Sequence, residues 1–143
     1  MSPTPIKPLY TAVALATGDG RNGHATTEDG FLDVDLQAPK ELGGAGGATN
    51  PEALFAAGYA ACFHSALKLV AAGDKLDVTG TEVSASASIG ATDGGGFGLA
   101  VELDVHAPNL DQDAAEALVA RAHEVCPYSN ATRDNIEVNL RVV

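Results

Sequence analysis

The chain has 143 residues, with 19 acidic and 8 basic side chains and a formal net charge of −11 at pH 7. This length suits one domain with a single core, so we predict one domain over residues 1–143. The negative charge repels phosphate backbones and anionic lipid surfaces, which disfavours nucleic-acid and membrane binding.

Two apolar segments bear on cellular location. The run over residues 53–67 is bounded by Glu52 and Lys68 and falls short of the roughly 18 apolar residues of a spanning helix. Near the N-terminus, LYTAVALATG could pass for the core of an export signal, but only Lys7 precedes it and it suits a strand equally well. We therefore expect a soluble, cytoplasmic protein.

The first forty residues alternate between apolar and polar positions and contain two turns. Alternation over residues 9–15 and 32–36 predicts strands with one buried and one wet face. Glycine-containing turns at residues 18–23 and 29–30 separate the strands. A small antiparallel meander is predicted, with Arg21 in or beside a hairpin connection.

A long helix is predicted from Asn50 to about Ala72. Asn50 can cap it, Pro51 suits the first helical position, and Glu52 lies at the positive end of the helix dipole. Between residues 53 and 67 the helix is apolar on nearly every side, which favours a second subunit as cover. Its small residues would allow close approach, although packing against a sheet alone is the alternative.

The second half of the chain predicts a hairpin, a helix and a final strand. Alternation over residues 83–89 and 99–105 indicates two paired strands. Residues 111–126 form an amphipathic pattern that ends at Cys126, and residues 136–142 alternate again. Without a regular βαβ repeat, this order favours an α+β fold, with antiparallel sheets around a long buried central helix.

The two cysteines lie in different settings. Cys62 lies in the middle of the apolar helix, and Cys126 ends the amphipathic one. A thiol reduces peroxide only as thiolate, and burial raises the pKa of Cys62, so a cation is needed beside it. Arg21 is the best candidate because glycines flank it at a hairpin tip, although a solvated surface arginine is the ordinary alternative.

Four segments together resemble the organic hydroperoxide resistance (Ohr) proteins of the wider Ohr/OsmC family. They are the GDGRNG turn, the NPE helix start, AACF around Cys62 and CPYSNATR from Cys126, and they follow the family's order over essentially the whole chain. The resemblance implies an OsmC-like fold and an intertwined homodimer. One departure is Asp134, where the family more often has glycine, and it concerns only the turn after Cys126.

The resemblance also implies a role for four residues. Cys62 would be the peroxidatic thiol, Cys126 the resolving thiol, Arg21 the thiolate-activating cation and Glu52 its orienting carboxylate. Attack of Cys62 on the peroxide would give a sulfenic acid, with which Cys126 condenses to a disulfide. That bond requires the fold to hold the two Cα atoms within roughly 7 Å.

Glu52 lies ten residues before Cys62 on the same predicted helix, a rise of about 15 Å. One arginine does not bridge that span comfortably, so we hypothesise that each site takes Glu52 from the opposite subunit. A first-turn acid that stabilises the helix dipole by about 0.3–1 kcal/mol is the plain alternative, and both roles can coexist.

The resemblance further implies a substrate class and a reductant. Organic and fatty-acid hydroperoxides would be preferred over hydrogen peroxide, and dihydrolipoyl groups on lipoylated proteins would reduce the disulfide, with no bound cofactor. An apolar pocket gains roughly 0.8 kcal/mol per buried CH₂ of such a substrate. The aromatic side chains that could line it, or simply form core, are Phe31, Phe55, Phe63, Phe97 and Tyr128.

Three other interpretations compete with the peroxidase: a metal site and a phosphate-binding loop, which the sequence supports poorly, and a non-enzymatic module. His123 and Cys126 share a helix face but lack further ligands, so no metal site is expected. The loop GGAGGATNPE lacks the lysine and hydroxyl of a phosphate-binding loop. The serious rival is a dimeric redox-sensing or lipid-binding module without turnover, which composition and patterning permit equally well.

Overall fold

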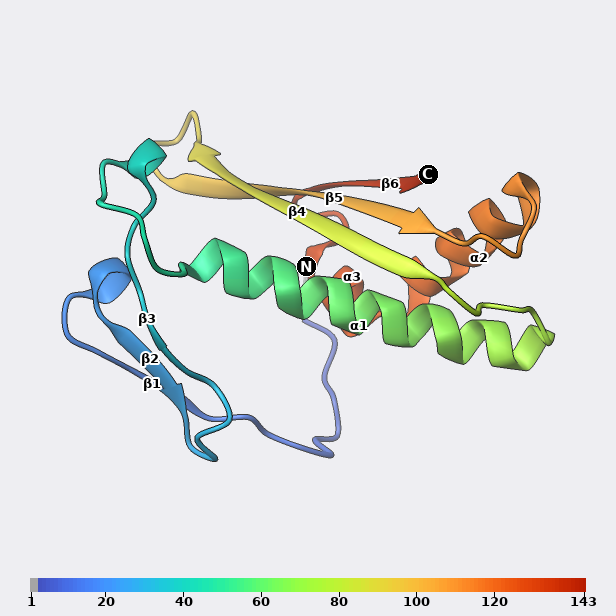
Figure 1. The fold of residues 1–143 in the computed structure, drawn as a ribbon, viewed down its shortest axis with the longest axis horizontal. Helices are drawn as coiled ribbons and strands as arrows, with labels where there is room; N and C mark the ends of the chain where they lie inside the picture. Colours follow the sequence, from blue (N-terminus) through green and yellow to red (C-terminus); the bar gives the residue numbers. More distant parts are fainter. Residues whose placement is uncertain (1–2) are drawn as a thin grey trace. The chain divides into compact units, whose positions relative to one another are not determined.

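The computed structural model describes residues 3–143. The predicted single domain contains two compact units, the first ending at Pro51 and the second running from Glu52 to Val143. Each unit has its own three-stranded sheet, and Figure 1 labels the helices and strands of both.

The first unit is the predicted antiparallel meander. Its strands β1 (Ala14–Thr17), β2 (His24–Thr27) and β3 (Asp33–Asp35) pair in the order β1-β2-β3. The first strand is shorter than the alternation over residues 9–15 predicts, because the partner strand β2 has only four residues, which pair with Ala14–Thr17. Between residues 3 and 51, only Leu36 and Ala38 are buried hydrophobic residues.

The connection between β1 and β2 carries Arg21, as predicted. It contains the 3₁₀ turn η1 (Gly20–Asn22), with Arg21 at its centre. Gly18 has a φ of +75°, which glycine adopts without strain. A Cβ at Gly23 would lie 2.3 Å from the carbonyl oxygen of Thr17, so only glycine fits there. The path of the Arg21 turn therefore depends on its glycines.

The second unit contains a mixed sheet of order β4-β5-β6. Strands β4 (Glu82–Ala91) and β5 (Phe97–His106) form the predicted antiparallel hairpin. Strand β6 (Glu137–Val142) pairs with β5 in parallel, whereas the sequence predicted antiparallel sheets. The reason is the helical connection between β5 and β6, which carries the chain back to the end where β5 begins.

Three helices accompany this sheet. The helix α1 (Pro51–Asp74) is the predicted central helix, and α2 (Gln112–Val125) is the predicted amphipathic one. The side chain of Asp111 caps α2 by accepting the Ala114 N–H at 2.8 Å. A short helix, α3 (Pro127–Thr132), follows and was not predicted.

One face of α1 packs into the core of the second unit, and Figure 1 shows the helix running along the sheet. The buried α1 residues pack with β5 and α2. The main members of this core are Tyr59, Phe63, Ala66, Leu67, Ala71, Val101, Leu103, Val105, Leu118, Val119 and Ala122. This core fixes α1 against the segments that follow β5.

The opposite face of α1 is exposed and consists largely of small residues. It includes Ala57, Ala61 and Ser65, and Leu69 is 71% exposed. By the length and mean hydropathy of the whole helix, α1 could cross a membrane. The sequence argument did not predict this, because it considered only the shorter apolar run over residues 53–67. That property is weak evidence of a span, because the core helix of a soluble protein also has it.

Candidate active site

The second unit brings the two thiols together. Cys62 lies in the middle of α1 and is half-buried, while Cys126 is fully buried at 0% exposure. The Cys126 thiol donates a hydrogen bond to the Cys62 sulfur, with 3.6 Å between the two Sγ atoms. The fold thus brings the two sulfur atoms into contact. Closing this distance to the roughly 2.05 Å of a disulfide needs a small shift of the side chains or backbone.

Cys126 is fixed by the helices on either side of it. Its N–H donates to the Ala122 carbonyl at the end of α2, and its carbonyl accepts the Asn130 N–H of α3, both at 2.9 Å. The residue is thus the C-cap of α2 and the N-cap of α3, with Pro127 in the first turn of α3. Backbone hydrogen bonds to α2 and α3 therefore fix the position of Cys126.

The surroundings of Cys62 oppose ionisation in one respect and favour it in another. Burial raises the pKa of the Cys62 thiol above its usual value, and the neighbouring Cys126 raises it further. The backbone amide of Tyr128 interacts with the Cys62 thiol and lowers this pKa, but burial dominates. A thiolate at Cys62 thus gains from any further positive charge placed beside it.

The two charged residues of the predicted site lie in different units. Arg21 lies on η1 in the first unit. Glu52 is half-buried in the first turn of α1, ten residues before Cys62 on that helix. Their roles toward Cys62, and the sharing of Glu52 between subunits, stay predictions.

An aromatic cluster lies beside the thiols. The Phe55 and Tyr128 rings stack, with centroids 6.1 Å apart, and Tyr59 meets both rings edge-on at 5.9 and 5.7 Å. A Cβ on Gly58 would lie 3.2 Å from the Tyr128 hydroxyl oxygen and 3.3 Å from its ring. The absence of a side chain at Gly58 therefore lets Tyr128 rest on α1.

The other aromatic residues predicted for a pocket lie elsewhere. Phe63 is fully buried in the core of the second unit. Phe97 is 76% exposed at the start of β5, and Phe31 is 94% exposed in the first unit. Of the five predicted aromatic residues, the structure thus brings Phe55 and Tyr128 into contact.

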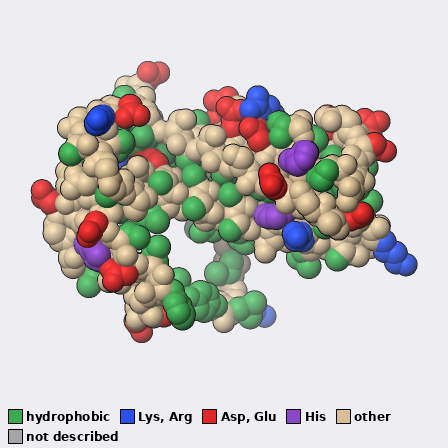
Figure 2. Space-filling model, in the orientation of Figure 1, with side chains coloured by type: hydrophobic (Ala, Val, Ile, Leu, Met, Phe, Trp, Pro, Cys, Tyr) green, Lys and Arg blue, Asp and Glu red, His purple; other side chains and the backbone are tan. Residues whose placement is uncertain are grey.

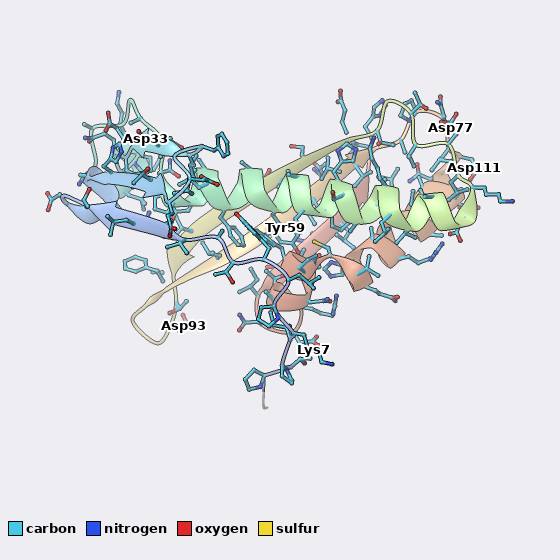
Figure 3. The ribbon with its side chains drawn as sticks, turned by 90° about the horizontal axis from the view of Figure 1, so that it is seen from below. Lys7, Asp33, Tyr59, Asp77, Asp93 and Asp111 are labelled. Atoms are coloured by element: carbon cyan, nitrogen blue, oxygen red, sulfur yellow. The ribbon has the colours of Figure 1, made fainter. Side chains whose placement is uncertain are left out.

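Tyr59 is a site residue that the sequence analysis missed. Its hydroxyl lies 2.8 Å from the Ser129 hydroxyl and 3.0 Å from the Thr132 hydroxyl, and all three residues are buried. Figure 3 labels Tyr59 near the middle of α1. The available signal was a tyrosine three residues before Cys62, together with two hydroxyl residues, Ser129 and Thr132, that follow Cys126 and are three positions apart.

The histidines have other partners. His24 contacts Asp33 and Asp35 of β3, and His64 Nε2 lies 2.9 Å from the Thr81 hydroxyl. The Nδ1 atom of His123 is buried and has no hydrogen-bond partner within residues 3–143. In the same range, no group of three or more His, Cys, Asp or Glu residues is arranged to hold a metal ion.

The sequence profile of the family described as OsmC-like protein matches residues 44–141, more than half of the chain. The chain belongs to the OsmC-like family. This confirms the family resemblance of the motifs around Cys62 and Cys126.

Several individual relatives are named organic hydroperoxide resistance proteins. The organic hydroperoxide resistance protein of Xanthomonas axonopodis pv. citri is 58% identical over 139 residues, covering 96% of each chain. A crystal structure of an organic hydroperoxide resistance protein from Legionella pneumophila matches with a TM-score of 0.91 and 57% identity, over 95% of this chain and 98% of that one. OhrB of Bacillus subtilis matches with a TM-score of 0.87 and 44% identity, over 95% and 100%.

Proposed function

We propose that this protein is a thiol-dependent peroxidase that reduces organic hydroperoxides to alcohols through Cys62 and Cys126. Membership of the organic hydroperoxide resistance family indicates a peroxide-detoxifying role in oxidative stress. The observation that carries the finer proposal is the pair of free thiols with sulfur atoms 3.6 Å apart.

The two thiols take different roles because their exposure differs. Cys62 is half-buried, which leaves part of it accessible to a peroxide, whereas Cys126 is fully buried and its thiol contacts the Cys62 sulfur. We therefore assign Cys62 as the peroxidatic thiol and Cys126 as the resolving thiol. A single oxidised sulfur at Cys62 would have its resolving partner already in contact.

In the first step the Cys62 thiolate attacks the distal peroxide oxygen. The O–O bond breaks, the alkoxide leaves and takes up a proton to become the alcohol, and Cys62 is left as a sulfenic acid. Arg21 stabilises the thiolate and the departing alkoxide, and Glu52 orients Arg21. Burial raises the pKa of Cys62, which is the reason a cation is needed.

In the second step Cys126 attacks the Cys62 sulfur. The S–S bond forms, the S–O bond breaks, and hydroxide leaves with the Cys126 proton as water. A dihydrolipoyl group on a lipoylated protein then returns two electrons and two protons, restoring both thiols as it becomes a cyclic disulfide. No bound cofactor takes part in this cycle.

The substrate is an organic hydroperoxide, including those of fatty acids. Phe55 and Tyr128 stack beside the thiol pair and offer apolar surface to an alkyl chain. Burial of such a chain would gain roughly 0.8 kcal/mol per CH₂, which hydrogen peroxide does not offer. Phe31, Phe63 and Phe97 are expected to matter less.

We also propose a cytoplasmic homodimer. The exposed face of α1 carries Ala57, Ala61 and Leu69, and the first unit exposes Leu9 and Phe31. A second copy of the chain would cover such apolar surface, and small residues allow close helix approach. Acidic side chains are spread over the face in Figure 2 with few basic ones among them, which disfavours nucleic acid and anionic membranes as partners.

The deciding experiment follows consumption of an organic hydroperoxide by the purified protein. Dihydrolipoamide and a monothiol are supplied in turn, beside the Cys62→Ser variant. We expect many turnovers with dihydrolipoamide, fewer with the monothiol and none in the variant. Stoichiometric oxidation without turnover would instead favour a redox-sensing or lipid-binding module.

A further inference from the structure

The Tyr59 hydroxyl joins the middle of α1 to both ends of one turn of α3. It lies 2.8 Å from Ser129 Oγ and 3.0 Å from Thr132 Oγ1. The Thr132 hydroxyl also contacts the Ser129 carbonyl at 3.3 Å. One arrangement of hydrogens satisfies all three hydroxyls: Ser129 donates to Tyr59, Tyr59 donates to Thr132, and Thr132 donates to that carbonyl.

This network is buried, so each of its hydrogen bonds matters. Tyr59 and Ser129 have 0% exposure and Thr132 has 6%. Leaving a buried hydroxyl without a hydrogen-bond partner costs more free energy than one hydrogen bond contributes to stability. The three hydroxyl groups are therefore held in this arrangement. The helix α3 has only six residues and is too short to be stable alone.

The helix α3 begins with the groups that touch Cys62. Its N-cap residue, Cys126, places its sulfur 3.6 Å from that of Cys62. Two residues later, the Tyr128 backbone amide interacts with the same Cys62 thiol. Any shift of α3 against α1 therefore changes both contacts together.

We propose that Tyr59 is a positioning residue for the thiol pair: its hydroxyl anchors α3 on α1 so that the Cys126 thiol and the Tyr128 amide both face Cys62. This inference rests on the proposed peroxidase function. In this role Tyr59 acts through Ser129 and Thr132.

The chemical consequence concerns the fate of the Cys62 sulfenic acid. With α3 anchored, Cys126 attacks it and water leaves. With α3 loosened, a second hydroperoxide reaches it first, transfers its distal oxygen to sulfur and leaves as the alcohol, which gives a sulfinic acid. The hydroxyl of Tyr59 thus favours the disulfide over irreversible oxidation.

The test compares Tyr59→Phe with Tyr10→Phe as a matched control. The first substitution removes only the anchoring hydroxyl, whereas Tyr10 is 79% exposed in the first unit. Intact-mass spectrometry after treatment with increasing cumene hydroperoxide measures the ratio of sulfinic acid to disulfide. Alkylation of Cys62 in a Cys126→Ser background, followed against pH, measures the Cys62 pKa.

For Tyr59→Phe we expect the sulfinic-to-disulfide ratio to rise about fivefold to tenfold, the scale of one lost buried hydrogen-bond network. Because the Tyr128 N–H lowers the Cys62 pKa, we also expect the alkylation profile to move to higher pH. Tyr10→Phe should match the wild type in both measurements. Thermal unfolding identifies the temperature range in which each variant is folded.

A folded Tyr59→Phe variant with the wild-type ratio and alkylation profile would overturn the inference. If that variant does not fold, Ser129→Ala and Thr132→Val each remove one partner, and each should raise the ratio by a smaller factor. Unchanged ratios in both would likewise overturn it. A wild-type protein that forms no disulfide with hydroperoxide would instead refute the proposed function.

Discussion

The thiol of Cys126 donates to the sulfur of Cys62 across 3.6 Å, although the two residues lie on separate helices. Cys62 is half-buried, whereas Cys126 is fully buried. In the proposed reaction, this asymmetry would let a peroxide reach Cys62 while the Cys126 sulfur is already in contact with it. The contact thus suits an ordered sequence of oxidation and disulfide closure.

Replacement of Cys62 and replacement of Cys126 should give different defects. Cys62→Ser should abolish hydroperoxide reduction, because the remaining thiol, Cys126, is fully buried. Cys126→Ser should still consume one equivalent to form the sulfenic acid at Cys62 and then a second equivalent to form the sulfinic acid, because no thiol resolves the sulfenic acid. Stopped-flow peroxide consumption and intact-mass spectrometry measure these outcomes. Identical behaviour of the two variants would contradict the assigned roles.

Replacement of Arg21 should change the pH dependence of the reaction. Burial raises the Cys62 pKa, and a nearby cation lowers it by stabilising the thiolate. In Arg21→Ala the alkylation profile of Cys62 should therefore shift to higher pH. Peroxidase activity should fall most at and below neutral pH, where less thiolate remains.

Arg121→Ala provides the matched control, because Arg121 is an exposed arginine paired with Asp74 at the end of α1. It should leave the profile unchanged. An alkylation profile for Arg21→Ala that superimposes on the wild type would exclude Arg21 as the activating cation.

The stability of the first unit should depend on His24. Hydrogen bonds to Asp35 and then Asp33 raise the His24 pKa above its usual 6.5, since two acceptors favour the doubly protonated ring. A raised folded-state pKa contributes stability that is complete below about pH 6.5 and is lost as the pH rises through the folded value. Thermal unfolding against pH should show this loss in the wild type.

His24→Gln should unfold at a lower temperature than the wild type at low pH. This difference in unfolding temperature should decrease as the pH rises. His106→Gln is the control, because His106 contacts the Val143 carbonyl rather than an acid pair. A gap that stays constant with pH would mean that His24 does not act through its charge.

Two glycines of α1 should respond differently to alanine. At Gly73 a Cβ meets nothing within 4 Å, so Gly73→Ala should stabilise the protein by up to about 1 kcal/mol through helix propensity. At Gly58 the same Cβ lies 3.2 Å from the Tyr128 hydroxyl oxygen, so the gain should be smaller or reversed. Chemical denaturation measures both, and equal gains would show that Tyr128 does not rest on Gly58.

Local sequence signals predicted most of the elements. Asn50 and Pro51 marked the start of α1, and alternation located β4, β5 and β6. The parallel pairing of β6 was missed, because alternation reports which face is buried and not which neighbour a strand meets. The helix α3 was missed because six residues are too few for a helical period to show.

The candidate site was predictable only in part. The resemblance to Ohr proteins paired Cys62 with Cys126, and the structure places their sulfurs in contact. The proposed role of Tyr59 was missed, because its partners lie on a helix far along the chain. A buried tyrosine in an apolar helix is by itself typical of core packing.

The most direct test of this account is the intact mass of the reduced protein after one equivalent of an organic hydroperoxide, followed by peptide mapping without reductant. We predict a mass lower by two hydrogen atoms and a single linked peptide pair that joins Cys62 to Cys126. An unchanged mass, or an added oxygen at Cys62 with Cys126 still a free thiol, would contradict the account.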